Sequence, residues 1–115
     1  MFKLKRAYDK PSAADGCRVL VDRLWPRGVT KQQARLDLWL RDIAPSPRLR
    51  VWFGHSPERW QAFQRRYWAE LRDRPELVAD LRKKGRSGVV TLVYAARDED
   101  HNHALALKRY LNRSR

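Results

Sequence analysis

The chain has 115 residues, of which 26 are Lys or Arg and 13 are Asp or Glu, giving a formal net charge of +13. This length is typical of a single domain with one hydrophobic core. Apolar residues make up 43% and five residues are Trp, which excludes a disordered tail. No apolar run approaches the ~20 residues of a membrane span and no signal segment is visible, so we expect a cytoplasmic protein without membrane contact. The single Cys17 excludes an intrachain disulfide and a Cys-based zinc site.

The surplus of positive charge leaves two interpretations of the surface open. Nineteen of the cations are Arg and seven are Lys, and they are spread along the whole chain. A solvated, Arg-rich surface explains this distribution, and so does attraction to an anionic partner. The pI near 10.9 is common among nucleic-acid-binding domains. However, the chain has no Cys2His2 ligands, no basic region leading into heptads and no RNP aromatic residues on a strand.

The first forty residues predict two strands and a short helix. Side chains alternate over residues 2–8 as in a strand, and the apolar run Val19–Val21 suits a buried strand of a parallel sheet. Thr30 and Gln33 have the spacing of a capping box, which predicts a short helix after Thr30. The alternation over residues 36–41 fits a strand and a helix equally.

Three helices are predicted in the middle of the chain. A Ser followed by Pro marks the start of the first at Ser46 and of the second at Ser56. The first ends at Gly54, and the third begins at Pro75 and is expected to stop at Gly85. The second runs to about residue 73, and helical spacing gives it an apolar face of Trp60, Phe63, Tyr67 and Leu71.

The strongest strand signal comes late, over residues 89–96, which are nearly all apolar. A last helix is expected to begin near Asp98 or Asp100, where acidic side chains complement the helix dipole. The order strand, strand, several helices, strand, helix predicts an α/β fold. We expect a single layered domain over residues 1–115, with a small, largely parallel sheet flanked by helices.

Polar segments follow two of the predicted strands at the point where each strand ends. Ligands of open parallel sheets bind at the carboxyl ends of the strands, which here lead into residues 22–28 and 95–103. Arginine forks bind phosphate or carboxylate through two contacts, and a helix N-terminus attracts anions. We therefore predict an anion-binding site whose ligand-binding residues are Arg23, Trp25, Arg27, Arg97, Asp98 and Asn102.

Structural roles are the alternative for the same residues. The acids at positions 98–100 are suited to capping the last helix, and they would compete with an anionic ligand. Arg23 and Arg97 have Asp22 and Asp98 as neighbours in the sequence, with which they could form internal ion pairs. Trp25 suits either an aromatic wall for a ring-bearing ligand or a cover over the end of the sheet.

His55 and His103 are the candidate catalytic residues, as an acid–base pair, if the fold brings them together. His55 also suits a turn in which backbone groups satisfy it. His101 and His103 are two residues apart and so do not share a helix face, and we predict no metal site. Cys17 stands at the entry end of its strand, where we expect a small core residue and not a nucleophile. The chain has no Gly-x-Ser-x-Gly elbow, P-loop or dinucleotide fingerprint, so we expect no cofactor.

Several blocks of residues, in order through nearly the whole chain, resemble those of a known family. They include Val19-Leu20-Val21-Asp22-Arg23-Leu24-Trp25-Pro26-Arg27-Gly28, Trp52-Phe53-Gly54-His55, Thr91-Leu92-Val93-Tyr94-Ala95-Ala96-Arg97-Asp98 and His101-Asn102-His103-Ala104. In these blocks the chain closely resembles the YeaO-like branch of an uncharacterised bacterial family, domain of unknown function 488. The resemblance implies a cytosolic, single-domain α/β protein with no established activity. Other branches are loosely similar and carry a Cys near the end of the last strand, which this chain lacks.

The leading hypothesis from the sequence is a small cytosolic protein with a pocket for an anionic, phosphate- or nucleotide-like ligand. The alternative is a nucleic-acid-binding accessory or regulatory protein that uses its diffuse Arg charge. A third interpretation is a protein-interaction module with exposed aromatic residues. Whether the protein is an enzyme, and its oligomeric state, stay open at this point.

Overall fold

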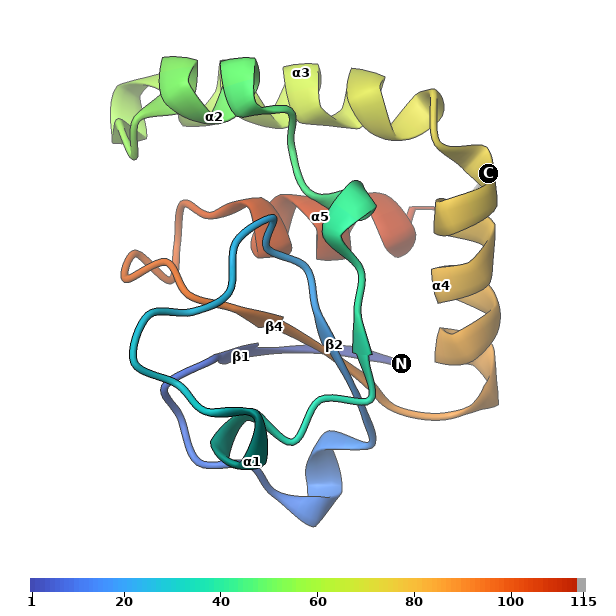
Figure 1. Ribbon diagram of the computed structural model, residues 1–115. Coiled ribbons are helices and arrows are strands. Elements are labelled where there is room, and N and C mark those ends of the chain that lie inside the picture. The colour runs from blue at the N-terminus through green and yellow to red at the C-terminus, as the bar shows by residue number, and fades with distance from the viewer. Residues whose placement is uncertain (114–115) are drawn as a thin grey trace.

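The computed structural model describes residues 1–113, and its centre is a sheet of four parallel strands in the order β1-β4-β2-β3 (Figure 1). The strands are β1 (Phe2–Arg6), β2 (Cys17–Leu20), β3 (Leu38–Trp39) and β4 (Val90–Tyr94). β4 pairs with both β1 and β2, and all its residues are buried, as its nearly continuous apolar sequence predicts. The predicted α/β fold class is confirmed.

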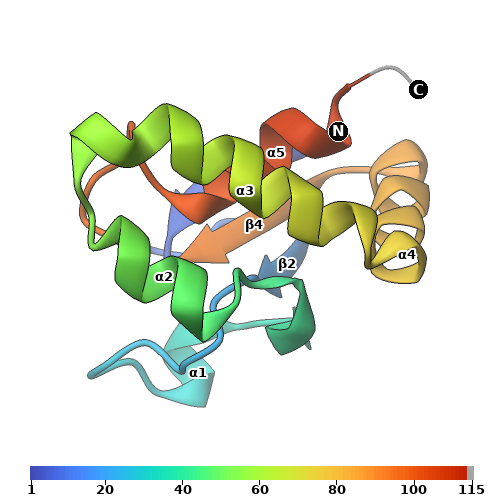
Figure 2. The ribbon, with the colours of Figure 1, turned by 90° about the horizontal axis from the view of Figure 1, so that it is seen from above.

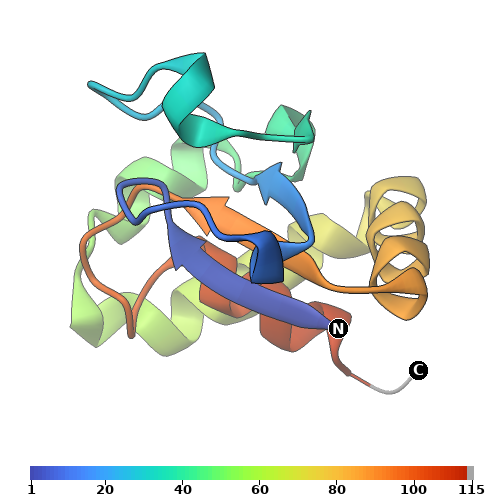
Figure 3. The same ribbon diagram turned by 90° about the horizontal axis from the view of Figure 1, so that it is seen from below.

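Helices cover the two faces of the sheet unequally. α5 (His103–Leu111) packs on one face, and α3 (Trp60–Arg72) lies over α5 with α2 (Pro47–Phe53) beside it (Figure 2). α4 (Pro75–Ser87) stands to one side and contacts both α3 and α5. The opposite face carries α1 (Lys31–Ala34) and the loop that leads to it from β2 (Figure 3). Short 3-10 turns lie at Ala13–Asp15, Arg41–Ile43 and Pro57–Arg59. Among residues 1–113, no helix combines the length and the apolarity needed to cross a membrane.

The core has a large part and a small part. The large part lies between the sheet and the long helices, and α3 contributes the face predicted from its periodicity, namely Trp60, Phe63, Tyr67 and Leu71. On the opposite face, a smaller cluster consists of Ala7, Leu20 and Val93, covered by Trp25, Leu36 and Trp39. Because α1 is only one turn long, loop side chains provide most of the cover on that face.

Local capping signals correctly predicted several helix ends. The Ser46 hydroxyl accepts the Leu49 amide at 3.2 Å, and Gly54 ends α2 with a left-handed φ of 52°. The capping box of Thr30 and Gln33 begins α1. The undecided segment 36–41 contains the two-residue strand β3, which pairs with the end of β2.

The last helix begins later than the sequence predicted. α5 starts at His103 with Asn102 as its N-cap, and no acidic residue stands in its first turn. One carboxylate oxygen of Asp98 accepts the backbone N–H groups of Asp100 (2.9 Å) and His101 (3.1 Å). This local turn competes with helix over residues 98–101, and it explains why the acidic residues precede the helix.

The prediction that α4 stops at Gly85 is also wrong, because the helix continues to Ser87. Gly85 is buried, and a Cβ added to it would lie 2.6 Å from Cζ of the Phe2 ring. The glycine is therefore used for the close approach of α4 to β1 and not for a turn.

Candidate functional site

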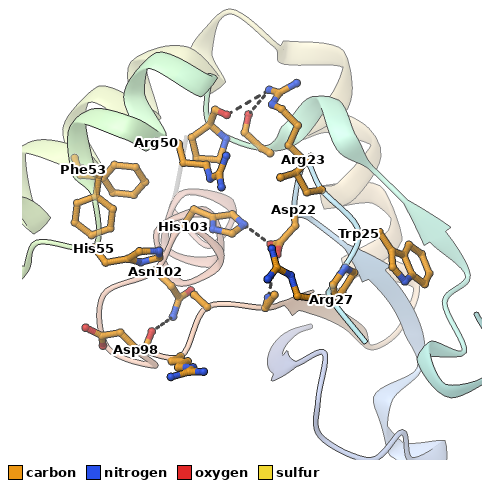
Figure 4. Close-up of a pocket in the computed structure, with 18 of the residues that line it drawn as sticks. Asp22, Arg23, Trp25, Arg27, Arg50, Phe53, His55, Asp98, Asn102 and His103 are labelled. Carbon is orange, nitrogen blue, oxygen red and sulfur yellow. Dashed lines mark hydrogen bonds and ion pairs between the residues drawn. The ribbon is translucent and has the colours of Figure 1, made fainter. Parts of the chain in front are cut away.

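A cavity of about 600 Å³ opens at the carboxyl ends of β2 and β4 (Figure 4). Six parts of the chain line it: the loop after β1, the loop after β2, residues 44–45 before α2, α2 with its following turn, Phe63 of α3, and the loop that joins β4 to α5. The eight residues proposed from the sequence all lie along this cavity, namely Arg23, Trp25, Arg27, His55, Arg97, Asp98, Asn102 and His103. The sheet therefore brings together residues that are up to 95 positions apart in the chain, as Tyr8 and His103 are.

Asp22 joins the two strand ends at the floor of the cavity. Its Oδ2 accepts the Ala95 backbone N–H at 3.0 Å, which fixes the loop after β4 to the loop after β2. Its Oδ1 lies 2.8 Å from Nε2 of His103, the first residue of α5. Both atoms are shielded from solvent, and their angles depart from hydrogen-bond geometry, so the pair is an ion pair when the imidazole is protonated.

Asp98 and Asn102 organise the loop between β4 and α5. A hydrogen bond with the His101 imidazole, helped by the Asp100 N–H, holds the pKa of Asp98 below its ordinary value. Asn102 uses both ends of its amide, because Oδ1 caps α5 at Leu105 N and Nδ2 donates to the Asp98 carbonyl. These two side chains therefore shape the cavity wall, and their proposed contact with a ligand stays a prediction.

Arg23 points along the rim and not into the opening. Its Nη2 donates to the carbonyl oxygens of Ala44 and Pro45, each at 3.3 Å, as Figure 4 shows. Its Nε is buried and has no hydrogen-bond partner in residues 1–113. Arg23 thus ties the loop after β2 to the segment before α2, while its buried Nε–H has no partner within residues 1–113.

Three other arginines line the cavity with their guanidinium groups unused. Arg27, Arg50 and Arg97 are exposed, and none makes a side-chain hydrogen bond or ion pair within residues 1–113. They come from three different segments: the loop after β2, α2, and the loop after β4. The sequence reasoning missed Arg50, although its position three residues before the buried Phe53 places both on one face of α2.

Of the two positions that the sequence left open for Trp25, the structure shows the indole over the smaller core, whereas Tyr8, to which the sequence gave no role, lines the cavity. The Trp25 indole packs edge-on against Trp39 in the smaller core, with centroids 5.4 Å apart, and donates to the Val29 carbonyl at 2.6 Å. Tyr8 lines the cavity and is 48% exposed, while its hydroxyl donates to the Arg27 carbonyl at 3.0 Å. No local motif marks Tyr8, because only the pairing of β1 with β4 brings it to this edge.

His55 follows Gly54 and shares its left-handed backbone, with a φ of 58°. This conformation is uncommon for a residue other than glycine, although His adopts it more readily than most. The imidazole centroid lies 6.2 Å from that of Phe53, at the side of the cavity nearest α2 (Figure 4). His55 and His103 thus line one cavity, which sequence alone could not establish.

Among the described residues that line it, the cavity wall lacks the alcohol, thiol and amine side chains of Ser, Thr, Cys and Lys. Cys17 begins β2, at the other end of the strand, and burial together with the nearby Asp37 carboxylate raises the pKa of its thiol. Residues 1–113 also contain no group of three or more His, Cys, Asp or Glu side chains arranged to hold a metal ion.

Comparison with known proteins agrees with the resemblance noted in the sequence. The model of the inactive DUF488-N3 subclade matches residues 1–114. The chain belongs to this family. An uncharacterised protein of Mycobacterium tuberculosis H37Rv is 44% identical over 110 residues, which is 96% of this chain and 92% of the relative. The uncharacterised protein YeaO of Escherichia coli K12 is 41% identical over 113 residues, covering 96% of each chain. No solved structure matches the chain.

Proposed function

We propose that the cavity binds a small phosphate- or nucleotide-like anion in a cytoplasmic protein. The observation that carries this proposal is the convergence of Arg27, Arg50 and Arg97, whose guanidinium groups have no partner within residues 1–113. Three like charges around one opening repel each other, so an arrangement of this kind gains free energy when an anion enters. The planar guanidinium fork also matches the geometry of phosphate oxygens.

The two carboxylates of the cavity offset this charge only in part, because four arginines line the cavity as well, and both carboxylates already have partners. Asp98 is engaged by His101 and by backbone N–H groups, and Asp22 by the Ala95 N–H and the His103 imidazole. The N-terminus of α5 also meets the cavity through Asn102 and His103, which adds the positive end of a helix dipole.

The residues that line the cavity favour binding of the ligand without a covalent reaction. No Ser, Thr, Cys or Lys side chain lines the described cavity, and the matching family model is that of an inactive subclade. His103, held by Asp22, then serves as a hydrogen-bonding group for the ligand. The enzymatic alternative assigns acid–base roles to His103 and His55, and it predicts turnover of a bound phosphate ester that is lost in both His103→Ala and His55→Ala.

Thermal unfolding with phosphate against chloride at matched ionic strength tests the proposal. For wild type we expect a saturable rise in Tm, because a ligand at ~100 times its Kd stabilises the native state by about 2.7 kcal/mol. In a domain of this size, that free energy corresponds to a shift on the order of 10 °C. Arg97→Ala should lose most of the shift. Arg65→Ala removes an exposed arginine of α3 outside the cavity and should keep it.

The comparison of these two variants decides the outcome. Equal, unsaturable changes in Tm for wild type, Arg97→Ala and Arg65→Ala would reflect a general salt effect and would contradict the proposed site.

A further inference from the structure

Tyr8 is an exposed aromatic residue whose hydroxyl group and ring are both held by neighbouring residues. The ring is 48% exposed at the edge of the cavity, and the hydroxyl donates to the Arg27 carbonyl at 3.0 Å. The Arg6 guanidinium lies over the ring, 5.1 Å from its centroid. Arg6 is itself fixed, because its Nε and Nη2 donate to the carbonyl oxygens of Ala96 and Ala95 at 2.9 and 3.3 Å.

The fold does not require the Tyr8 ring to be fixed in this way. Half of its surface remains in water, so its burial contributes little to the core, while the contacts with Arg6 and Arg27 restrict its rotamers. An aromatic group that is ordered beforehand loses little conformational entropy when a second ring stacks on it. Tyr8 therefore has the properties of a stacking surface.

The position of Tyr8 connects that surface to the anion site. Its hydroxyl bonds to the backbone of Arg27, whose guanidinium is one of the three unused cations of the cavity. Arg6 binds the carbonyls of the loop that leads directly to Arg97, another of the three. A ligand ring stacked on Tyr8 would thus lie next to an anion bound by Arg27 and Arg97, at the same edge of the sheet.

We propose that the ligand is a phosphate ester with a flat aromatic ring, such as a nucleoside monophosphate, and that this ring stacks on Tyr8. The inference rests on the proposed function, because it assumes that the cavity binds an anion. A volume of about 600 Å³ is within the range of pockets for ligands of this size. Trp25, the aromatic residue suggested by the sequence, has its indole packed in the smaller core instead.

Binding of AMP, ribose 5-phosphate and adenosine, measured by titration calorimetry, separates the two parts of the ligand. In wild type we expect AMP to bind more tightly than ribose 5-phosphate, and adenosine to bind most weakly. Relative to Tyr8→Phe, which also loses the hydroxyl bond to the Arg27 carbonyl, Tyr8→Ala should weaken AMP binding by about 5- to 100-fold, the range of one base-stacking contact, and leave ribose 5-phosphate binding unchanged. Tyr8→Phe keeps the ring and should retain most of the preference for AMP. Tyr8→Leu, which keeps apolar bulk, serves if Tyr8→Ala does not fold.

The outcomes distinguish this inference from the proposed function. If neither phosphate ester binds to wild type, both are overturned. If both esters bind equally well, or if Tyr8→Ala weakens them by the same factor, the anion site stands and the stacking role of Tyr8 is overturned.

Discussion

Arg18 carries a positive charge at a position with an exposed fraction of only 4%. Its Nη1 lies 2.7 Å from Oδ2 of Asp15, and its Nε and Nη2 donate to the Ala34 carbonyl. Lys5 contacts the other oxygen of Asp15 at 2.9 Å. Burial alone would raise the pKa of Asp15, but hydrogen bonds from Lys5, the Ser12 N–H and Arg18 outweigh it and hold the pKa below its ordinary value.

Replacing Asp15 by Asn should destabilise the protein by about 3–5 kcal/mol, because it leaves the charge of Arg18 buried without its partner. The folded-state pKa is lowered, so the stabilisation is complete above the ordinary pKa of 3.8 and is lost as the pH falls through the folded-state value. Urea unfolding from pH 7 to pH 3 should thus show a steeper loss of stability for wild type than for Asp15→Asn. Asp9→Asn changes an exposed carboxylate and should have the same stability and the same pH dependence as wild type. A destabilisation of Asp9→Asn as large as that of Asp15→Asn would contradict this explanation.

Residue-level chemistry at the site was only partly readable from the sequence. Arg27 and Arg97 follow strands, so the rule that parallel strands present their carboxyl ends at one edge was enough to place them. Tyr8 and Arg50 could not be selected in the same way, because they reach the cavity through the pairing of β1 with β4 and the position of α2. The direction of the Arg23 and Trp25 side chains depends on tertiary contacts that no local pattern encodes.

At the scale of elements, capping residues in the sequence correctly predicted those helix ends that depend on short-range hydrogen bonds. The N-caps of α1 and α2 and the left-handed Gly54 depend on hydrogen bonds within a few residues, and they lie where the sequence placed them. Two helix boundaries were predicted wrongly. The start of α5 is delayed by a competing local turn around Asp98, and Gly85 lies inside α4, where it packs against Phe2 instead of ending the helix.

Gly85→Ala tests the packing of α4 against β1. Alanine has the higher helix propensity by about 1 kcal/mol, so an exposed helical position would gain stability from this change. Here the added Cβ would meet the buried Phe2 ring, and overpacking of this kind costs about 1–3 kcal/mol, so we expect a net loss in chemical unfolding. Adding Phe2→Leu should recover part of the loss. A more stable Gly85→Ala would show that the two elements separate easily.

At the scale of the whole molecule, part of the positive charge has an internal use. The guanidinium groups of Arg41, Arg66 and Arg113 lie 3.9, 4.0 and 4.8 Å from the ring centroids of tryptophans on neighbouring segments, Trp39, Trp52 and Trp68. Arginine stems in such positions cover apolar rings while the charge stays near water. Part of the high arginine content thus covers tryptophan rings of β3, α2 and α3.

This use of arginine bears on the nucleic-acid alternative. If charge alone drives binding, affinity for a DNA duplex should be weak near physiological salt and should fall steeply and linearly in a plot of log affinity against log salt concentration. Fluorescence anisotropy with two unrelated duplexes measures this slope, and we expect no preference between them. A Kd below about 10⁻⁸ M with a clear sequence preference would favour the nucleic-acid function instead.

The order of strands in the sheet also constrains the order of events during synthesis. β4 lies between β1 and β2, which do not pair with each other, so until residues 90–94 leave the ribosome β1 has no partner in the sheet and β2 pairs only with the two residues of β3. The helices of the intervening segment form from local contacts and can precede this step, whereas the pairings of β1 with β4 span most of the chain. The binding site shares this timing, because the hydrogen bond between Asp22 and the Ala95 N–H forms only when β4 inserts.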